Sequence, residues 1–205
     1  MSLIKGKNIL LTGGSRGIGK SIVQVLIKNG ANVGFTYSSS EDAANKISKK
    51  LNSDSTKCIA YKSDASLLEE CEKLVESFLN DFETIDVLIN NAGGAPMANA
   101  LKASNKFHEA IIDLNLSAPL NVSQRFAKMM MKQKTVSNII NISSVTATRP
   151  TPGSAAYGAA KGGLVNLTKT LAVEWAPKIK VNSMKEACAK CFAVHLLIFE
   201  ILQIT

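Results

Sequence analysis

A tyrosine and a lysine lie one helical turn apart in the segment SAAYGAAKGG, at Tyr157 and Lys161, and every residue around them is small. On a helix, side chains four residues apart share one face. A phenol beside an ammonium group could donate a proton to a substrate, because a neighbouring cation favours the ionised phenol. The same spacing arises by chance on many helices, so the pair alone is weak support for catalysis and the rest of the chain must decide.

Short apolar runs alternate with longer amphipathic segments along the chain. Helical spacing predicts five helices and the apolar runs predict six strands, with Gly30 as a helix C-cap. The helices are expected at 19–30, 41–51, 66–82, 104–133 and 154–176, and the strands at 8–12, 31–37, 57–62, 85–90, 137–143 and 179–183. Apolar strands that alternate with helices indicate a Rossmann-like α/β fold, a doubly wound sheet of six parallel strands covered on both faces.

Composition places the chain among soluble globular proteins. It has 205 residues, of which 46% are hydrophobic and 20% charged. We expect no signal peptide, no membrane span, reduced cysteines and a cytoplasmic location. The net charge is +8, but the lysines are scattered and no basic run is interleaved with aromatic residues. The charge therefore favours anionic ligands, and nucleic-acid binding is not expected.

A glycine-rich turn, LLTGGSRGIGK, joins the first predicted strand to the first helix. Gly13, Gly17 and Gly19 permit a tight turn and a close approach of the backbone to a ligand. The start of the following helix offers free N–H groups to a pyrophosphate. The spacing G-x-x-x-G-x-G differs from the general G-x-G-x-x-G fingerprint. Its position favours a dinucleotide site that includes Ser15 and Ile18 of the same turn.

The end of the second predicted strand bears on the choice of cofactor. An acidic residue there would bind the ribose 2′-hydroxyl of NAD, but none occurs before Glu41. The chain instead has Arg16 in the glycine-rich turn and Ser38 directly after the strand. An arginine with nearby hydroxyls suits a 2′-phosphate, so we predict NADP(H). The alternative is that Arg16 faces solvent and the serines only form a turn.

Asp64 and Ala65 follow the third predicted strand. A carboxylate at that position could accept a hydrogen bond from an adenine amino group. It could equally cap the next helix, a role for which Ser66 competes. We include Asp64 and Ala65 in the predicted cofactor site.

The segment NNAGG follows the fourth predicted strand and contains Asn91, Ala92 and Gly93. Its small residues let the backbone contact a flat or bulky ligand, and its side-chain amides can tie neighbouring strands together. A plain turn is the alternative. We include Asn91, Ala92 and Gly93 in the predicted cofactor site.

These motifs occur together in an order and spacing that resemble the short-chain dehydrogenase/reductase family. They are TGGSRGIG, Asp64, NNAG, Asn115 in DLNLS, Ser144 in NISSV, and YGAAK. From about Lys5 to Ser183 the chain is most similar to the 3-oxoacyl-acyl-carrier-protein reductases of fatty acid biosynthesis. The resemblance implies the NADPH-dependent reduction of a ketone, with a 3-oxoacyl thioester as the best substrate class. The motifs are specific for the family rather than for the substrate.

The resemblance also implies a role for each catalytic residue. Tyr157 would protonate the carbonyl oxygen, while Lys161 would promote that proton transfer and hold the cofactor's ribose hydroxyls, so both residues also contact the cofactor. Ser144 would hydrogen-bond the substrate oxygen, with Ser143 as its competitor. Asn115 would hold a water that links Lys161 to solvent, or it is an asparagine inside a helix that bonds only to backbone.

The resemblance ends after KVNS. Members of the family continue with a Pro-Gly turn, a substrate lid, a helix and a seventh strand, whereas this chain reads MKEACAKCFAVHLLIFEILQIT. We predict an NADP-binding catalytic domain over 1–183 and a divergent tail over 184–205 that lacks the lid and the seventh strand, as in a truncated product. The alternative function is a module that binds nucleotide or pairs with another subunit without catalysis.

The tail contains Cys188, Cys191 and His195. These residues are too few for a convincing zinc site, and an apolar helix is the favoured interpretation, so no metal is expected. The family often pairs subunits through the helices that carry Asn115 and Tyr157. We therefore expect a homodimer through those helices.

Overall fold

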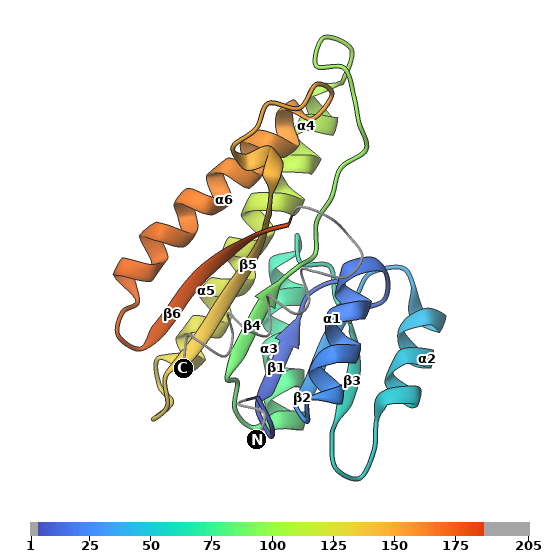
Figure 1. Ribbon diagram of the computed structural model, residues 1–205, viewed down its shortest axis with the longest axis vertical. Helices are drawn as coiled ribbons and strands as arrows, with labels where there is room; N and C mark the ends of the chain where they lie inside the picture. The colour runs from blue at the N-terminus through green and yellow to red at the C-terminus, as the bar shows by residue number, and fades with distance from the viewer. Residues whose placement is uncertain (1–3, 187–205) are drawn as a thin grey trace.

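The structure, a computed structural model, describes residues 4–186. A sheet of six strands forms its centre, in the order β3-β2-β1-β4-β5-β6, and every neighbouring pair is parallel (Figure 1). This confirms the predicted fold class. The strands are β1 (Asn8–Leu11), β2 (Asn32–Tyr37), β3 (Cys58–Lys62), β4 (Val87–Asn90), β5 (Ser137–Ser144) and β6 (Ile179–Glu186).

The helices follow the strands in alternation, as predicted, but the long helix expected over 104–133 is divided. A π-helical turn, η1, separates α4 from α5 in the middle of that segment. The helical elements are α1 (Gly17–Lys28), α2 (Glu41–Leu51), α3 (Leu68–Phe82), α4 (Asn105–Ile112), η1 (Asp113–Ser117), α5 (Ala118–Met130), the 3-10 turn η2 (Val145–Ala147) and α6 (Ala155–Glu174).

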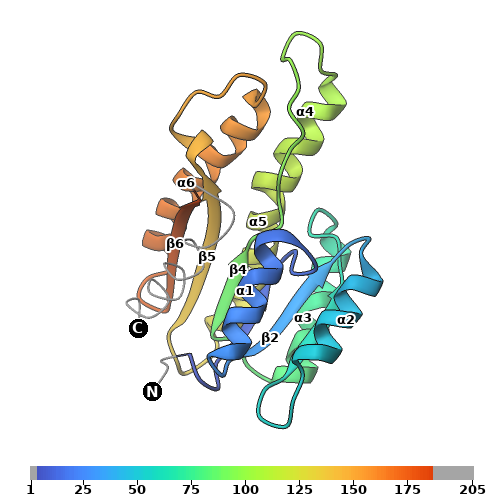
Figure 2. The same cartoon turned by 45° about the vertical axis from the view of Figure 1, so that its right-hand side comes forward.

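The helices cover both faces of the sheet. Figure 2 shows α1 and α2 on one side, and α3, α5 and α6 lie on the other. Successive side chains of a strand point to opposite faces. In β1, Ile9 and Leu11 therefore pack into the cluster under α1 and α2, whereas Leu10 packs into the cluster under α3, α5 and α6.

Several element ends differ from the sequence prediction by one to three residues, and the ends of α1 and β6 are two of them. α1 ends at Lys28, Asn29 is its C-cap, and Gly30 follows in the left-handed region with φ 84°. β6 runs on to Glu186 instead of stopping at Ser183. No proline interrupts this segment, so its N–H groups continue to pair with β5, up to the register Ser144↔Glu186. The expectations for the remaining tail, including Cys188, Cys191 and His195, lie outside the described residues.

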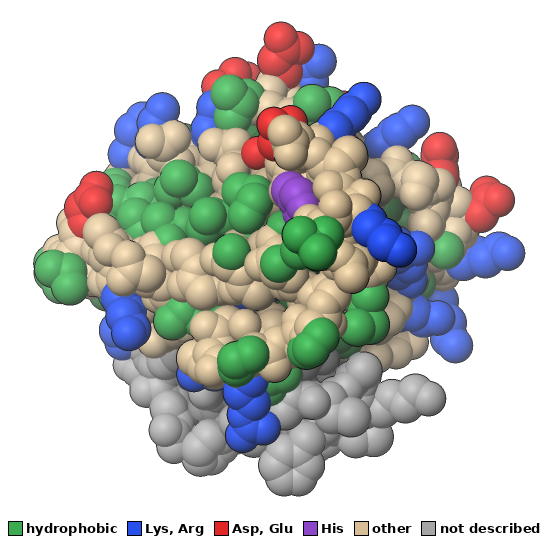
Figure 3. Space-filling view, turned by 90° about the horizontal axis from the view of Figure 1, so that it is seen from above, with side chains coloured by type: hydrophobic (Ala, Val, Ile, Leu, Met, Phe, Trp, Pro, Cys, Tyr) green, Lys and Arg blue, Asp and Glu red, His purple; other side chains and the backbone are tan. Residues whose placement is uncertain are grey.

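The carboxyl ends of all six strands lie at one edge of the sheet, and the loop from β4 to α4 rises beyond that edge. Figure 3 views the molecule from above this edge. Apolar side chains gather on one side of the face, and lysine and arginine side chains lie at its margins. Among residues 4–186, no helix has the length and apolarity of a membrane-spanning segment.

Candidate functional site

A cavity of about 340 Å³ opens at the carboxyl ends of β1, β2 and β4. It lies where the chain leaves β1 for one side of the sheet and β4 for the other, the position at which doubly wound folds bind ligands. Three turns that are far apart in sequence meet there. Its lining residues are Gly13, Ser15, Arg16, Gly17, Ile18, Gly19, Tyr37, Ser38, Ser39, Ser40, Asn91, Ala92, Gly93 and Leu114.

Two glycines of the first turn leave no room for a side chain. Gly13 has φ 73°, and a Cβ atom there would lie 3.1 Å from the Cα of Ala92. A Cβ atom on Gly19 would collide with the carbonyl oxygen of Gly13 and lie 2.6 Å from Nδ2 of Asn91. The turn after β1 and the turn after β4 therefore touch through backbone, and the first turn of α1 faces the cavity between them.

Side chains at the strand ends hold these turns in place. Oγ1 of Thr12 accepts hydrogen bonds from the N–H groups of Asn91 and Ala92, each at 3.0 Å. Nδ2 of Asn91 donates to the carbonyls of Thr12 and Gly13, and Oγ1 of Thr36 accepts from the N–H of Gly13. The prediction that the amides of NNAGG tie neighbouring strands is thus confirmed. Thr12 and Thr36 were missed, although a hydroxyl at the end of an apolar strand was the available signal.

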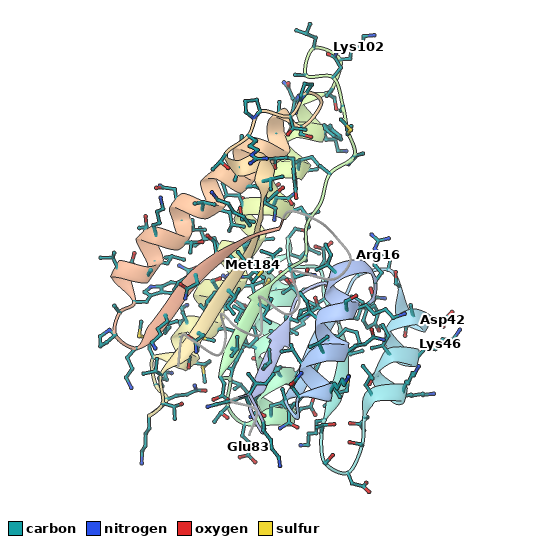
Figure 4. All side chains as sticks on the ribbon, in the orientation of Figure 1. Arg16, Asp42, Lys46, Glu83, Lys102 and Met184 are labelled. Atoms are coloured by element: carbon teal, nitrogen blue, oxygen red, sulfur yellow. The ribbon has the colours of Figure 1, made fainter. Side chains whose placement is uncertain are left out.

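Arg16 and the serines after β2 border the same cavity. Arg16 is the N-cap residue of α1 and is exposed, and Figure 4 shows its side chain extending away from the end of that helix. Ser38, Ser39 and Ser40 lie opposite, before α2 begins at Glu41. Among the described lining residues there are hydroxyls and one cation but no carboxylate. This arrangement suits an anionic group.

The structure does not place Asp64 or Ala65 in the lining of this cavity. Oδ1 of Asp64 accepts from the N–H and the hydroxyl of Ser66, at 3.0 and 2.7 Å. The N-cap residue of α3 is Leu67, which makes no side-chain cap. The proposal that Asp64 or Ser66 caps this helix is therefore wrong, because the two side chains bond to each other in the turn that precedes it.

Tyr157 and Lys161 lie in the first two turns of α6, beside the end of β5. Nζ of Lys161 is 5.8 Å from the centre of the Tyr157 ring and donates to the carbonyl of Ile142 at 2.8 Å. Lys161 is 3% exposed, so its charge acts in a surrounding that screens it poorly. The two side chains therefore share one face of α6, as their spacing predicts.

The two serines at the end of β5 point to opposite sides of the strand. Ser143 is buried, and its hydroxyl donates to the backbone carbonyl of Lys161 at 3.2 Å. Ser144 is partly exposed, and its Oγ accepts from the N–H of Thr146 at the start of η2. The hydroxyl of Ser144 can still donate to a ligand, whereas that of Ser143 is committed to the protein interior.

Asn115 lies in the π-helical turn η1 and is fully buried. Its Nδ2 donates to the carbonyls of Ile111 and Gly94, and its Oδ1 accepts from the N–H of Gly94. Pro119, four residues later, has no N–H for the Asn115 carbonyl, and its ring would clash with that carbonyl in a regular α-helix. A wider π turn relieves this conflict, and such turns are frequent at functional sites. The proline was present in the sequence but its effect was not predicted.

Gly93 connects two of the predicted catalytic residues, Asn115 and Lys161, to the cavity. It is one of the lining residues, and a Cβ atom there would lie 2.7 Å from Oδ1 of Asn115 and 3.3 Å from Nζ of Lys161. The buried ammonium of Lys161 therefore lies directly behind the turn that lines the cavity. The structure therefore places Asn115 and Lys161 against the turn that lines the cavity, whereas Tyr157 lies beside Lys161 and does not itself line that cavity.

A buried polar chain supports this crevice from below. Nδ2 of Asn90 donates to Ser123 and to Asn141, both at 2.8 Å, and Nδ2 of Asn141 donates to Thr168 at 2.9 Å. The hydroxyl of Thr168 in turn donates to the carbonyl of Leu164 on α6. These bonds fix β4, β5, α5 and α6 relative to one another. The sequence analysis missed them, although Asn141 within the apolar run SNIINIS was a signal.

The residues at the cavity fit a dinucleotide. The glycines give the backbone a surface that any Cβ atom would fill, and the first turn of α1 presents its N–H groups to the same space. The chemistry of the donors, backbone amides with hydroxyls and one guanidinium, matches phosphate groups. In residues 4–186 no group of three or more histidine, cysteine or acidic side chains could hold a metal ion.

Comparison with known proteins agrees with this geometry. The profile of the family described as short chain dehydrogenase matches residues 7–194. The chain is 35% identical, over 90% of its own length and 74% of the relative, to a 3-oxoacyl-[acyl-carrier-protein] reductase of Synechocystis sp..

Solved structures show the same likeness. A short-chain dehydrogenase/reductase from Serratia marcescens superposes with a TM-score of 0.83 at 32% identity, covering 89% of this chain and 74% of that one. A short chain dehydrogenase from Burkholderia cenocepacia in complex with NADP superposes with a TM-score of 0.82 at 30% identity, covering 88% and 73%. The chain belongs to the short-chain dehydrogenase/reductase family.

Proposed function

We propose that this protein reduces a ketone to a secondary alcohol with NADPH, and that Tyr157 is the general acid. The observation that carries the proposal is the contact at Gly93. There the ammonium of Lys161, which lies below the ring of Tyr157, is close to the turn that lines the cavity. The proposed proton donor is thus linked through Lys161 to the wall of the proposed cofactor site, and a carbonyl reduction requires the two to be close.

Each residue has a distinct part in the proposed reaction. When bound, NADPH would supply a hydride to the carbonyl carbon. The hydroxyl of Tyr157 transfers its proton to the carbonyl oxygen, which takes up the electron pair of the broken C=O π bond. Ser144 donates a hydrogen bond to that oxygen and orients it. Lys161 stabilises the phenolate that remains on Tyr157, because a cation near a developing negative charge lowers its energy most where water is excluded.

Asn115 positions the crevice in this proposal. Its side chain bonds to both backbone groups of Gly94, and so holds the turn that lines the cavity against Lys161. Its backbone carbonyl, which Pro119 cannot satisfy, is the acceptor for a solvent molecule that would return a proton to Lys161.

The proposed cofactor is NADPH rather than NADH. Arg16 with Ser38, Ser39 and Ser40 surrounds the end of the cavity next to β2, where a 2′-phosphate would lie. The structural relative from Burkholderia cenocepacia, whose complex contains NADP, supports this choice. Asp64 would contact the adenine only from outside the described lining of the cavity, so its contribution to affinity is expected to be small.

The proposed substrate class is a 3-oxoacyl thioester. The support is the name of the relative from Synechocystis sp., a 3-oxoacyl-[acyl-carrier-protein] reductase. The proposal therefore assigns the chain to the reductive step of fatty acid biosynthesis. Other ketones remain to be compared with it in the same assay.

The test is NADPH oxidation, followed at 340 nm, with acetoacetyl-CoA as substrate. The wild type is expected to turn over acetoacetyl-CoA, faster with NADPH than with NADH, and Tyr157→Phe is expected to reduce kcat by about 1,000-fold. NADPH binding by the wild type without turnover would instead support a module that only binds nucleotide or pairs with a subunit.

We also propose a homodimer that pairs α4, α5 and α6 with a second copy. Apolar side chains, among them Val173 on α6 and Met131 just after α5, are exposed on these elements. Light scattering coupled to size exclusion would show twice the mass of one chain. A monomer at micromolar concentration would contradict the dimer and leave the catalytic proposal untouched.

A further inference from the structure

A second cavity, of about 560 Å³, lies between the loop after β5 and the first turns of α6. Hydroxyl side chains and two prolines line most of it, and it contains a single charged side chain, that of Arg149. Its described lining residues are Thr146, Ala147, Thr148, Arg149, Pro150, Thr151, Pro152, Ser154, Ala155, Gly158 and Ala159. Cavities of this size hold small ligands or parts of larger ones.

The cavity adjoins the proposed reaction centre on two sides. Gly158, the residue after Tyr157, packs so closely on the loop that a Cβ atom would lie 3.2 Å from the carbonyl oxygen of Thr146. Thr146 is also the residue whose N–H bonds to Ser144. The loop that positions Ser144 and the helix turn that carries Tyr157 are therefore the two walls of this second cavity.

The guanidinium of Arg149 is available to a ligand. Arg149 is exposed, and neither of the two ion pairs within residues 4–186 involves it. No carboxylate is found among the described lining residues that could neutralise it. An arginine with no acidic neighbour, next to several hydroxyls, is suited to hold a carboxylate or a phosphate.

The loop that carries Arg149 is held in a defined shape. The N–H groups of Thr148 and Arg149 both donate to the carbonyl of Val145, and the N–H of Ala98 donates to Gly153 from the loop between β4 and α4. Pro150 restricts the backbone directly after Arg149. The backbone of Arg149 is therefore already ordered, which reduces the conformational entropy that is lost when its guanidinium binds a ligand.

We propose that Arg149 forms a subsite for an anionic group of the ketone substrate. The inference rests on the proposed function and extends it, because it states that the substrate bears a carboxylate or a phosphate in addition to its ketone. A carboxylate would come from a free 3-oxo acid, and a phosphate from the coenzyme A arm of a thioester. Both are recognised by the same guanidinium chemistry.

Kinetics with three substrates test the subsite: acetoacetate, acetoacetyl-CoA and the neutral ester ethyl acetoacetate. In Arg149→Gln, the ratio of kcat/KM for an anionic substrate to that for the neutral ester is expected to fall about tenfold, with the change mainly in KM. The substrate whose ratio falls identifies the source of the anion. Arg149→Lys keeps the charge without the planar fork and should give an intermediate loss.

The control is Lys73→Gln, which removes one positive charge from an exposed position on α3. It should leave the ratio unchanged, because a general field effect is screened by salt over such a distance. Equal losses for all three substrates in Arg149→Gln, or no loss for either anionic one, would overturn the subsite.

Calorimetry separates this inference from the proposed function. If the wild type reduces none of the three ketones, the proposed function fails, and binding of acetoacetate and of coenzyme A to the NADP⁺-saturated protein still tests Arg149. Binding that Arg149→Gln weakens about tenfold supports the subsite. Equal or absent binding in both proteins overturns it. Circular dichroism of Arg149→Gln establishes that the variant is folded.

Discussion

The two halves of the molecule solve different problems with different parts of the chain. The half that carries most of the proposed nucleotide site, residues 4–82 with β1 to β3 and here called the nucleotide half, shapes that site with glycine backbone and short hydroxyl side chains. The half that carries the proposed catalytic residues, residues 83–186 and here called the catalytic half, positions them with buried polar side chains that bond across β4, β5, α5 and α6. Figure 4 labels Arg16, next to α1 of the first half, and Met184, on β6 of the second.

This contrast shows which substitutions each half should tolerate. Where the backbone itself would contact the ligand, an added side-chain atom should lower ligand affinity more than the loss of a side chain does. Where buried polar side chains hold the site together, the loss of a side chain should be the more damaging change, because it leaves a buried polar group unpaired. The NNAGG turn is the joint between the halves, since Asn91 bonds to the first and Gly93 contacts Asn115 and Lys161 of the second.

The largest expected effect on cofactor affinity comes from Gly19→Ala in the nucleotide half. The added methyl group collides with the carbonyl of Gly13, so the turn must shift. Over-packing of about 1–3 kcal/mol corresponds to a rise of about 5- to 150-fold in the Kd for NADPH. Fluorescence titration with NADPH measures it.

The matched control is Gly162→Ala in α6, whose added methyl meets only the carbonyl of Ala147, at 3.5 Å. There alanine should keep NADPH affinity and stabilise the helix by up to about 1 kcal/mol. Equal Kd values for Gly19→Ala and Gly162→Ala would show that the backbone of the turn does not shape the site.

Asn141→Leu should destabilise the catalytic half, with a smaller expected effect than that of Gly19→Ala. It removes the acceptor of Asn90 and the donor to Thr168, and leaves buried polar groups without partners. We expect a loss of about 2 kcal/mol in the free energy of unfolding, measured by urea denaturation. Asn166→Leu, on the exposed surface of α6, should change it by less than about 0.5 kcal/mol. Equal free energies of unfolding for the two variants would show that the hydrogen bonds of Asn141 do not stabilise this half.

Pro119→Ala should increase the stability of the catalytic half and lower its activity. Alanine supplies an N–H to the carbonyl of Asn115, so the helix can become regular and gain about 1 kcal/mol of stability. The same change draws Asn115 away from Gly94 and Lys161, and we expect kcat to fall about tenfold. Urea unfolding and steady-state kinetics measure the two effects, with Gln124→Ala on the same helix as control. A variant that gains stability and keeps its kcat would remove the functional role of the π turn.

The smallest expected effect is a pH dependence in the nucleotide half. Burial raises the pKa of the Cys58 thiol to about 12. Because the folded protein keeps this thiol protonated to a higher pH than the unfolded chain does, the thiol contributes to the free energy of unfolding. This contribution is fully present below the unfolded pKa near 9 and is lost as pH rises from 9 towards 12. Between pH 8 and 9.5 the wild type should lose about 0.8 kcal/mol more than Cys58→Ala.

Urea unfolding at the two pH values measures this difference. Cys58→Ala removes the thiol but no other titrating group. The change in the free energy of unfolding that comes from the smaller side chain is the same at both pH values, so it cancels in the comparison. Parallel pH profiles for the two proteins would mean that the Cys58 thiol ionises in the folded state as readily as in the unfolded chain.

Much of this molecule could be predicted from its sequence because apolar periodicity determines the strands and helices locally. The glycine-rich turn and the pair of Tyr157 and Lys161 follow from local spacing in the same way. Partners that meet only after folding could not be predicted, such as Thr12 with Asn91 or Asn141 with Thr168. The predicted N-cap of α3 was wrong because Asp64 and Ser66 bond to each other in the turn before the helix.

The π turn illustrates the limit most clearly. Pro119 is visible in the sequence and the helix that contains it was predicted, but the π turn between α4 and α5, which includes Asn115 four residues before the proline, was not. The end of β6 was likewise decided by pairing with β5 rather than by its own residues. Long-range contacts therefore set the details of the catalytic half, and in the nucleotide half they complete a turn whose glycines were already visible in the sequence.

The measurement that most directly tests the central claim is a paired one on Tyr157→Phe: the Kd for NADPH and kcat at saturating NADPH. Tyr157 belongs to the catalytic half and does not line the cavity of the nucleotide half. We predict a Kd within about threefold of the wild-type value together with a kcat lower by about 1,000-fold. A kcat close to that of the wild type would contradict the assignment of Tyr157 as the proton donor.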